Sequence, residues 1–185
     1  DLPPTVALQI ARRASRTTAL ALVAADEAWR MAALGTADAV AVVLGTTTGG
    51  MTTGEECYRR QLLGERNRHA LSQWLETPIS VPVDAVAQAF GCRGPRLTVS
   101  TACSSGANAL GFAADWIRAG RASHVLCGGT EALCRMTYSG FNILQTLDRH
   151  PCRPFDRRRA GLTLGEGAAV FVFEGWESAQ NRGAR

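Results

Sequence analysis

The chain lacks lysine altogether, because all 20 of its basic residues are arginines. This absence excludes a phosphate-loop lysine, a Schiff-base lysine and a Ser–Lys nucleophile pair within these residues. The apolar runs are too short to cross a bilayer, and no charged stretch followed by an apolar run marks a secretory signal at the start. We expect no membrane span, and we expect natural sequence before Asp1 because it is not a methionine.

Paired cysteines are also missing. The six cysteines are scattered without any C-x-x-C pair, at Cys57, Cys92, Cys103, Cys127, Cys134 and Cys152. This spacing argues against a zinc site and a thioredoxin-like motif, so we expect no metal. A chain of this length does not need disulfides for stability. We therefore expect reduced thiols, most of them packed in the core, and a cytoplasmic location.

Apolar sequence is plentiful enough for one domain. Of the 185 residues, 46% are hydrophobic, which excludes a disordered chain. The net charge of +4 is modest. The arginines are scattered and no aromatic residues interleave with them, so we expect no nucleic-acid partner.

Short apolar runs alternate with helical patterns along the chain. Residues 15–34 predict a helix that Ser15 caps and Gly35 ends. Its predicted apolar face carries Leu20, Val23, Ala24, Met31 and Leu34. The uninterrupted apolar run 40–44 predicts a strand covered on both faces. Further strands are predicted at residues 97–100, 124–127 and 168–174, and the alternation with helices indicates an α/β fold.

The stretch from Leu97 to Ala107 is the strongest candidate for a site. A β-branched strand turns there into a small-residue helix, with Cys103 at the turn. A thiol in that position lies over the unpaired N–H groups at the positive end of the helix dipole, a setting that favours the thiolate. The same groups can hold the oxyanion that forms when sulfur attacks a carbonyl. Cys103 is therefore a candidate acyl acceptor.

Three other patterns allow chemistry, and each has a structural alternative. The loop 45–50 could cradle phosphate, but without a lysine we favour a tight turn that lines a pocket. Ser104 and Ser105 could be nucleophiles, but no glycine stands two residues before Ser104, as the G-x-S-x-G pattern of hydrolases requires. Glu131 and Glu166 could form an acid–base pair, but we favour bonds to backbone or arginine around a pocket.

Four ordered motifs resemble the N-terminal half of the β-ketoacyl-acyl carrier protein synthases, which have the thiolase-like fold. They are Gly94-Pro95 with residues 99–106, residues 117–131, Arg153-Pro154-Phe155-Asp156, and Gly165-Glu166-Gly167-Ala168 with Arg182-Gly183-Ala184. The resemblance implies a layered α-β-α half-fold, with a mixed sheet and a buried helix after the nucleophile. It also implies one ketosynthase N-terminal domain over residues 1–185, incomplete at both ends and without the C-terminal half.

The resemblance implies an acyltransferase of fatty acid or polyketide biosynthesis. Cys103 would accept the acyl group as a thioester, and its N–H would bind the oxyanion. Decarboxylative Claisen condensation with malonyl-acyl carrier protein would follow. Phe141 matches a phenylalanine near the family's acyl pocket, although core packing explains it equally well. The implied partners are acyl carrier protein, acyl and malonyl thioesters and a second subunit, identical or related. No cofactor is implied, since the phosphopantetheine arm belongs to the carrier.

The family's two catalytic histidines belong to its second half, and the histidines of this chain do not match them. We interpret His124 as a strand cap and His150 as part of an exposed turn. The fragment alone is therefore expected not to complete a condensation. An alternative is a non-catalytic, chain-length-factor-type partner of an active synthase. Cysteine rather than glutamine at position 103 favours the condensing subunit.

A set of arginines could dock an acidic carrier protein, or could simply be solvated side chains. They are Arg12, Arg13, Arg59, Arg60, Arg157, Arg158 and Arg159. Gln145 stands where many family members have a basic docking residue, four positions after Phe141. This substitution weakens the docking interpretation.

Overall fold

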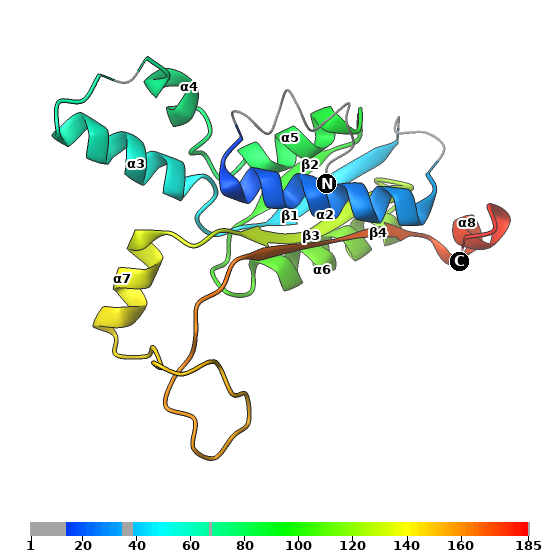
Figure 1. The fold of residues 1–185 in the computed structure, drawn as a ribbon. Helices are drawn as coiled ribbons and strands as arrows, with labels where there is room; N and C mark the ends of the chain where they lie inside the picture. Colours follow the sequence, from blue (N-terminus) through cyan, green and yellow to red (C-terminus); the bar gives the residue numbers. More distant parts are fainter. Residues whose placement is uncertain (1–13, 35–38, 67, 185) are drawn as a thin grey trace.

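The computed structural model describes residues 14–34, 39–66 and 68–184. Helices and strands alternate along these ranges (Figure 1): α2 Arg16–Ala32, β1 Val40–Gly45, α3 Met51–Leu62, α4 Ala70–Trp74, α5 Val81–Ala89, β2 Arg96–Val99, α6 Ser105–Arg118, β3 His124–Glu131, α7 Arg135–Ile143, β4 Gly167–Glu174 and α8 Trp176–Asn181. None of the helices within these ranges combines the length and the apolar character that crossing a membrane requires.

One mixed sheet organises the described part of the chain. Its strand order is β2-β1-β3-β4, with β1 parallel to both β2 and β3, and β4 antiparallel to β3. Because β1, β2 and β3 run the same way, their carboxyl ends meet at one edge of the sheet. The predicted α/β class and mixed sheet are confirmed.

Strand β1 supplies side chains to two hydrophobic cores, one on each face of the sheet. Val40, Val42 and Leu44 pack in a core with α2 and α5. Ala41 and Val43 point to the other face, where they join a core with α6. Figure 1 shows α2 and α5 on one side of the sheet and α6 on the other. Since every residue of β1 is buried, the prediction of a strand covered on both faces is confirmed.

Helix α6, predicted to be buried, is covered on one face only within the described residues. Ser105, Ala109 and Ala113 are buried against the sheet. Other residues of the helix, among them Ala107, Gly111 and Arg118, are exposed, and Phe112 is 46% exposed. The predicted helix after the nucleophile is therefore present and packs on the sheet, and within the described ranges its buried residues are the ones that face the sheet.

The start of helix α2 follows the sequence prediction. The Ser15 side chain accepts a hydrogen bond from the Thr18 N–H, so Ser15 is the N-cap. The helix ends at Ala32, and the C-cap residue Ala33 adopts a left-handed backbone with φ 49°. Gly35, the predicted end of this helix, lies outside the described residues.

The predicted apolar face of α2 is wrong. The buried apolar side chains of this helix are Ala21, Leu22 and Ala25, whereas Met31 is 87% exposed. Small residues on the buried face let the helix lie close to β4 and α5. The packing also buries Leu22, so the periodicity misjudged which side of the helix faces the sheet rather than the size of the buried side chains.

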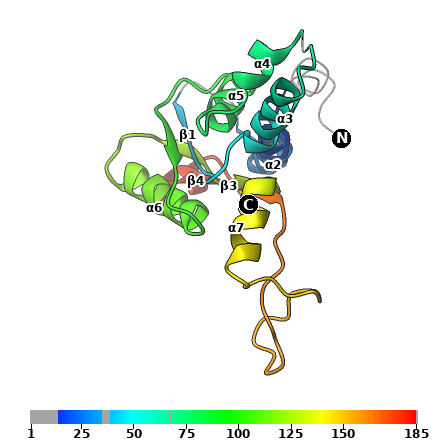
Figure 2. The same cartoon turned by 90° about the vertical axis from the view of Figure 1, so that its left-hand side faces the viewer.

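Two segments extend away from the sheet and its covering helices. Helices α3 and α4 project on one side, and α7 with the long loop 144–166 projects on another (Figure 2). The Asp148 carboxylate fastens the loop by accepting the N–H groups of His150 at 3.0 Å and Ala160 at 3.3 Å. The bond from the His150 N–H is the main cause that lowers the pKa of Asp148.

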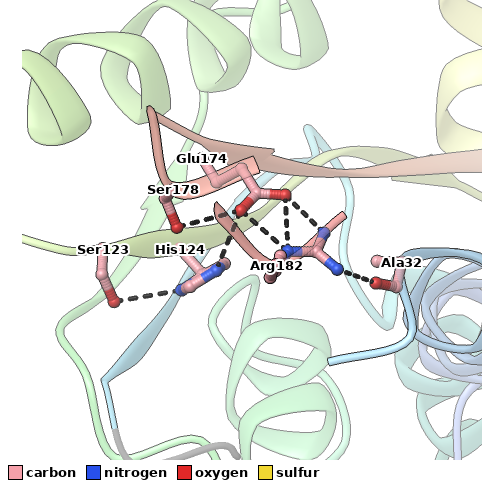
Figure 3. A network of polar contacts seen from close by, with 6 residues as sticks. All are labelled: Ala32, Ser123, His124, Glu174, Ser178 and Arg182. Carbon is pink, nitrogen blue, oxygen red and sulfur yellow. Dashed lines mark hydrogen bonds and ion pairs between the residues drawn. The ribbon is translucent and has the colours of Figure 1, made fainter. Parts of the chain in front are cut away.

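A polar network joins α8, β4 and α2 at the sheet edge remote from Cys103 (Figure 3). Glu174 at the end of β4 accepts hydrogen bonds from Arg182 and Ser178. Arg182 also donates to the Ala32 carbonyl at 2.6 Å. The Arg182 guanidinium holds the pKa of the Glu174 carboxyl below its usual value. The arginine therefore fastens the C-terminal helix to both neighbours.

Candidate active site

Cys103 lies in a sharp turn between strand β2 and helix α6. The strand ends at Val99 and the helix begins at Ser105, so the turn consists of the five residues 100–104. Ala102, immediately before the cysteine, adopts a left-handed backbone with φ 54°, which an alanine rarely tolerates. The turn places Cys103 just before the start of α6, as the sequence predicts, and it leaves this residue exposed.

The serines next to Cys103 hold this turn together. The Thr101 N–H donates to Ser105 Oγ at 2.9 Å, and the Ser105 hydroxyl donates to the Ala102 carbonyl at 2.6 Å. Ser104 Oγ donates to the Thr101 carbonyl at 2.8 Å. Both hydroxyls therefore have structural partners, which argues against the serine-nucleophile interpretation.

Glycines let the start of α6 approach the sheet edge closely. A Cβ on Gly45, at the end of β1, would lie 2.3 Å from the backbone C and O of Ser105. A Cβ on Gly129 of β3 would lie 3.2 Å from the Gly106 Cα. The first contact leaves no space for a side chain. The backbone of α6 therefore lies directly on the carboxyl ends of β1 and β3.

A cavity of about 670 Å³ opens beside Cys103 at this edge of the sheet. Its lining includes Cys103 from the turn, Phe141 from α7, Leu133 and Leu164. The structure thus brings the two predicted site residues to one cavity although they are far apart in sequence. Phe141 is half-buried, and it borders the cavity rather than a closed core.

The loop 45–50 contributes to the lining of this cavity, and a carboxylate accepts hydrogen bonds from its backbone N–H groups. Glu131, at the end of β3, accepts the N–H of Thr47 at 2.7 Å and the N–H of Thr48 at 3.2 Å. The hydroxyls of Thr46 and Thr48 donate to the same carboxylate. The structure therefore agrees with a turn lining a pocket, because the groups that would hold phosphate already have an anionic partner.

Glu166 has a different set of partners from Glu131. Its carboxylate accepts Arg16 Nε at 2.8 Å and the Leu133 N–H at 3.4 Å. The hydrogen bond from Arg16 is the main cause that lowers the pKa of Glu166. The two glutamates thus bond to backbone and arginine around the cavity, as the sequence analysis favours.

Sequence reasoning missed Glu55, which fixes the helix that carries Phe141. From α3 its carboxylate accepts the N–H groups of Arg135 at 2.9 Å and Met136 at 2.7 Å, at the start of α7. A carboxylate is well placed there, at the positive end of a helix dipole. No local signal could have found it, because 80 residues separate Glu55 from Arg135.

The histidines and most other cysteines lie away from the cavity lining. His124 begins β3, at the strand end opposite to Glu131, and its Nε2 lies 3.2 Å from Glu174 without hydrogen-bond alignment. His150 lies in the exposed loop. Burial raises the pKa of Cys92 to about 11 and that of Cys127 to about 12, as befits core thiols. Within residues 14–34, 39–66 and 68–184, no cluster of His, Cys, Asp and Glu could hold a metal ion.

Several of the arginines considered for carrier docking have acidic neighbours. Arg59 and Arg60 both donate to Glu56, at 2.9 Å and 2.8 Å, and these bonds lower the pKa of Glu56 to about 2. Arg158 Nε lies 4.0 Å from Asp156. Arg12 and Arg13 lie outside the described residues. The positive charge available for a partner is thus smaller than the arginine count indicates.

Comparison with known proteins finds one family model that matches most of the chain. Residues 5–179 match the model for "Beta-ketoacyl synthase, N-terminal domain". A "3-oxoacyl-[acyl-carrier-protein] synthase 2" from Staphylococcus aureus is 37% identical, over 94% of this chain and 46% of that protein. The chain thus spans about half the length of the curated relatives it matches.

Solved structures give the same result. "The ishigamide ketosynthase/chain length factor" superimposes with a TM-score of 0.86 and 29% identity, over 94% of this chain and 44% of the other. A type II PKS acyl-carrier protein in complex with its ketosynthase bound to the hexaketide matches with a TM-score of 0.80 and 26% identity, over 94% and 47%. The thiolase-like ketosynthase fold predicted from the motifs is therefore confirmed.

Proposed function

Because this chain belongs to the β-ketoacyl synthase family, through that family's N-terminal domain, we propose that it supplies the acyl-accepting half of a condensing enzyme. The whole enzyme would be a β-ketoacyl-acyl carrier protein synthase of fatty acid or polyketide biosynthesis. One observation carries the proposal: the exposed Cys103 stands in the turn before α6 and borders a cavity of about 670 Å³. A nucleophile with space for an acyl chain beside it is what acyl transfer requires.

Acyl transfer at this site would take two steps. The Cys103 thiolate attacks the carbonyl carbon of an acyl thioester, a C–S bond forms, and the carbonyl electron pair moves to oxygen. The Cys103 N–H and the start of α6 would stabilise that oxyanion. Collapse of the intermediate breaks the bond to the carrier's sulfur, which leaves as a thiolate and takes up a proton. The acyl group then remains on Cys103.

The chemistry of the lining suits an aliphatic chain. Five threonines border the cavity: Thr46, Thr47, Thr48, Thr130 and Thr137. Each hydroxyl already has a hydrogen-bond partner within the protein. Because these hydroxyls are already bonded, the threonines can contact an acyl chain through their methyl groups. Leu133, Leu164 and Phe141 add further apolar surface to the lining. We propose that Phe141 limits the length of the chain that fits.

Condensation would follow when a malonyl thioester loses CO₂ and its enolate attacks the acyl carbon, which releases the Cys103 thiolate. Decarboxylation needs groups that polarise the malonyl carbonyl. None of the histidines in the described residues lines the cavity. We therefore assign that step to the part of the fold that completes the family's relatives, and we expect residues 1–185 alone not to condense.

The proposed partners follow from the relatives. One solved relative is a ketosynthase in complex with an acyl-carrier protein, and another is a ketosynthase/chain length factor. We propose that this chain likewise takes acyl and malonyl groups from a carrier and pairs with an identical or related subunit. No cofactor of its own would be needed, because the phosphopantetheine arm belongs to the carrier. The free cysteines suit a cytoplasmic location.

Mass spectrometry of the full-length protein tests the role of Cys103. After incubation with an acyl-acyl carrier protein thioester, we expect a mass increase of one acyl group on the peptide that contains Cys103. A Cys103→Ala variant should gain no label, whereas Cys152→Ala, which removes the other exposed thiol among residues 1–185, should be labelled normally. Label retained by Cys103→Ala would exclude the proposed acceptor. Absence of label in the unsubstituted protein would favour the second candidate, a non-catalytic partner subunit.

A further inference from the structure

The peptide unit that joins Ala102 to Cys103 is held by three hydrogen bonds to one atom. The Ala102 carbonyl oxygen accepts the Ser105 hydroxyl at 2.6 Å and the Ser105 N–H at 3.0 Å. The third donor is the Thr47 hydroxyl at 3.2 Å, which comes from the loop after β1. Two of the donors are thus local, whereas the third reaches the turn across 55 residues of sequence.

Fixing this carbonyl also fixes the N–H of Cys103. The described peptide bonds include no cis bond, so the unit is trans and planar. In a trans peptide the C=O and the following N–H point in opposite directions. Donors on the Ala102 oxygen therefore set where the Cys103 N–H points, and hydrogen bonds in a chain polarise one another. They also stabilise the left-handed backbone of Ala102, which is unfavourable for a residue with a side chain.

Thr47 does not hold its place alone. Its N–H donates to Glu131 Oε2 at 2.7 Å, and Glu131 Oε1 accepts the N–H of the next residue, Thr48, at 3.2 Å. Glu131 belongs to β3, which pairs with β1 on one side and with β4 on the other. A carboxylate on the rigid sheet thus fixes the threonine that in turn contacts the Ala102 carbonyl.

We propose that Thr47, anchored by Glu131, is a positioning residue that orients the Cys103 N–H as an oxyanion donor. This inference rests on the proposed function, since it matters only if Cys103 attacks a carbonyl. Thr47 does not itself act on the substrate in this role. It acts through the Ala102–Cys103 peptide, so its loss should impair reactions that form an oxyanion and spare those that do not.

Two reagents separate these cases in the full-length protein. 4-Nitrophenyl acetate acylates a thiol through a tetrahedral oxyanion, whereas iodoacetamide alkylates it by displacement at carbon without one. Removing an oxyanion donor outright typically lowers rates by about 10² to 10³. Since Thr47→Val leaves both Ser105 bonds in place, we expect acylation of Cys103 to fall about tenfold and alkylation to change less than about twofold.

Thr47→Ser and Thr163→Val are the matched variants. Thr47→Ser keeps the donor and should restore acylation to near the unsubstituted rate. Thr163 donates to the His150 carbonyl in the exposed loop at 3.3 Å, so Thr163→Val makes the same chemical change outside the cavity lining and should leave both rates unaltered.

The outcomes distinguish the inference from the proposed function. A selective loss of acylation in Thr47→Val, rescued by Thr47→Ser, would support the positioning role. Equal acylation in Thr47→Val and the unsubstituted protein would overturn the inference and leave the proposed function intact. Parallel losses of acylation and alkylation would overturn it too, since they indicate a general disturbance of the turn. If the unsubstituted Cys103 accepts no acetyl group, both proposals fail.

Discussion

Replacing Gly45 by alanine tests whether the nucleophile's position depends on contact between α6 and the end of β1. The added Cβ would lie 2.3 Å from the backbone C and O of Ser105 and 2.5 Å from the Gly106 nitrogen. Carbon atoms normally make contact at about 3.5 Å or more. The start of α6 must therefore move by about 1 Å. The obstructing atoms are backbone, so no side-chain rotation can relieve the clash.

Two effects should follow from that movement. Overpacking of this kind costs about 1–3 kcal/mol of unfolding free energy. In addition, the turn that holds Cys103 precedes α6 directly and should shift with it. A displacement of about 1 Å at a reacting group can lower a rate about 10²-fold. We therefore expect Gly45→Ala to lower both stability and acylation of Cys103.

The assay compares Gly45→Ala with Gly111→Ala in the full-length protein. Gly111 lies within the same helix, and a Cβ there meets no atom within 4 Å. Alanine should therefore stabilise α6 by about 0.5–1 kcal/mol there. Urea unfolding gives the free energies, and release of 4-nitrophenolate from 4-nitrophenyl acetate gives the acylation rates. Unchanged stability and acylation in Gly45→Ala would refute the reasoning, as would an equal destabilisation by Gly111→Ala.

Two further predictions concern the edge network and the cavity. Arg182 lowers the pKa of Glu174, so this pair stabilises the fold above the ordinary carboxyl pKa and loses its effect as the pH falls through the lowered value. Glu174→Gln should lower the unfolding free energy at pH 7 by about 1–3 kcal/mol and flatten its decline as the pH falls below the ordinary carboxyl pKa; identical urea curves for both proteins at pH 7 and at acidic pH would contradict this. Phe141→Ala should raise acylation by long-chain relative to short-chain acyl thioesters, because it removes a ring from the cavity wall; an unaltered chain-length profile would remove Phe141 from the role proposed for it.

Local sequence was sufficient to predict those features whose signal lies within one helix, strand or turn. Ser15 caps α2 through its own side chain, and the unbroken apolar run of β1 is buried on both faces. The motifs around Cys103 also indicated the family correctly, because a strand–cysteine–helix turn is encoded within a few adjacent residues. Side-chain periodicity failed for the buried face of α2, because that face is decided by the elements that pack against the helix.

The hydrogen-bond partners of the site residues could not be predicted from local sequence. Glu131 and Thr47 are separated by 84 residues, and Glu55 lies 80 residues before the helix start that it caps. Neither carboxylate belongs to a local pattern that reveals its role. The sequence predicts for Glu131 only hydrogen bonds to backbone or arginine near a pocket, and it does not predict the link through Thr47 to the cysteine turn.

The sequence by itself determined the order of strands and helices, the turn that carries Cys103 and the family to which the chain belongs. These depend on neighbouring residues, whose propensities and capping bonds act over one or two turns of chain. Only the tertiary structure decided which carboxylates hold the loop and α7, which helix faces are covered and which residues surround the cavity. Those outcomes depend on parallel strands that bring distant segments to one edge of the sheet. Backbone groups there form hydrogen bonds with side chains that are far away in the sequence.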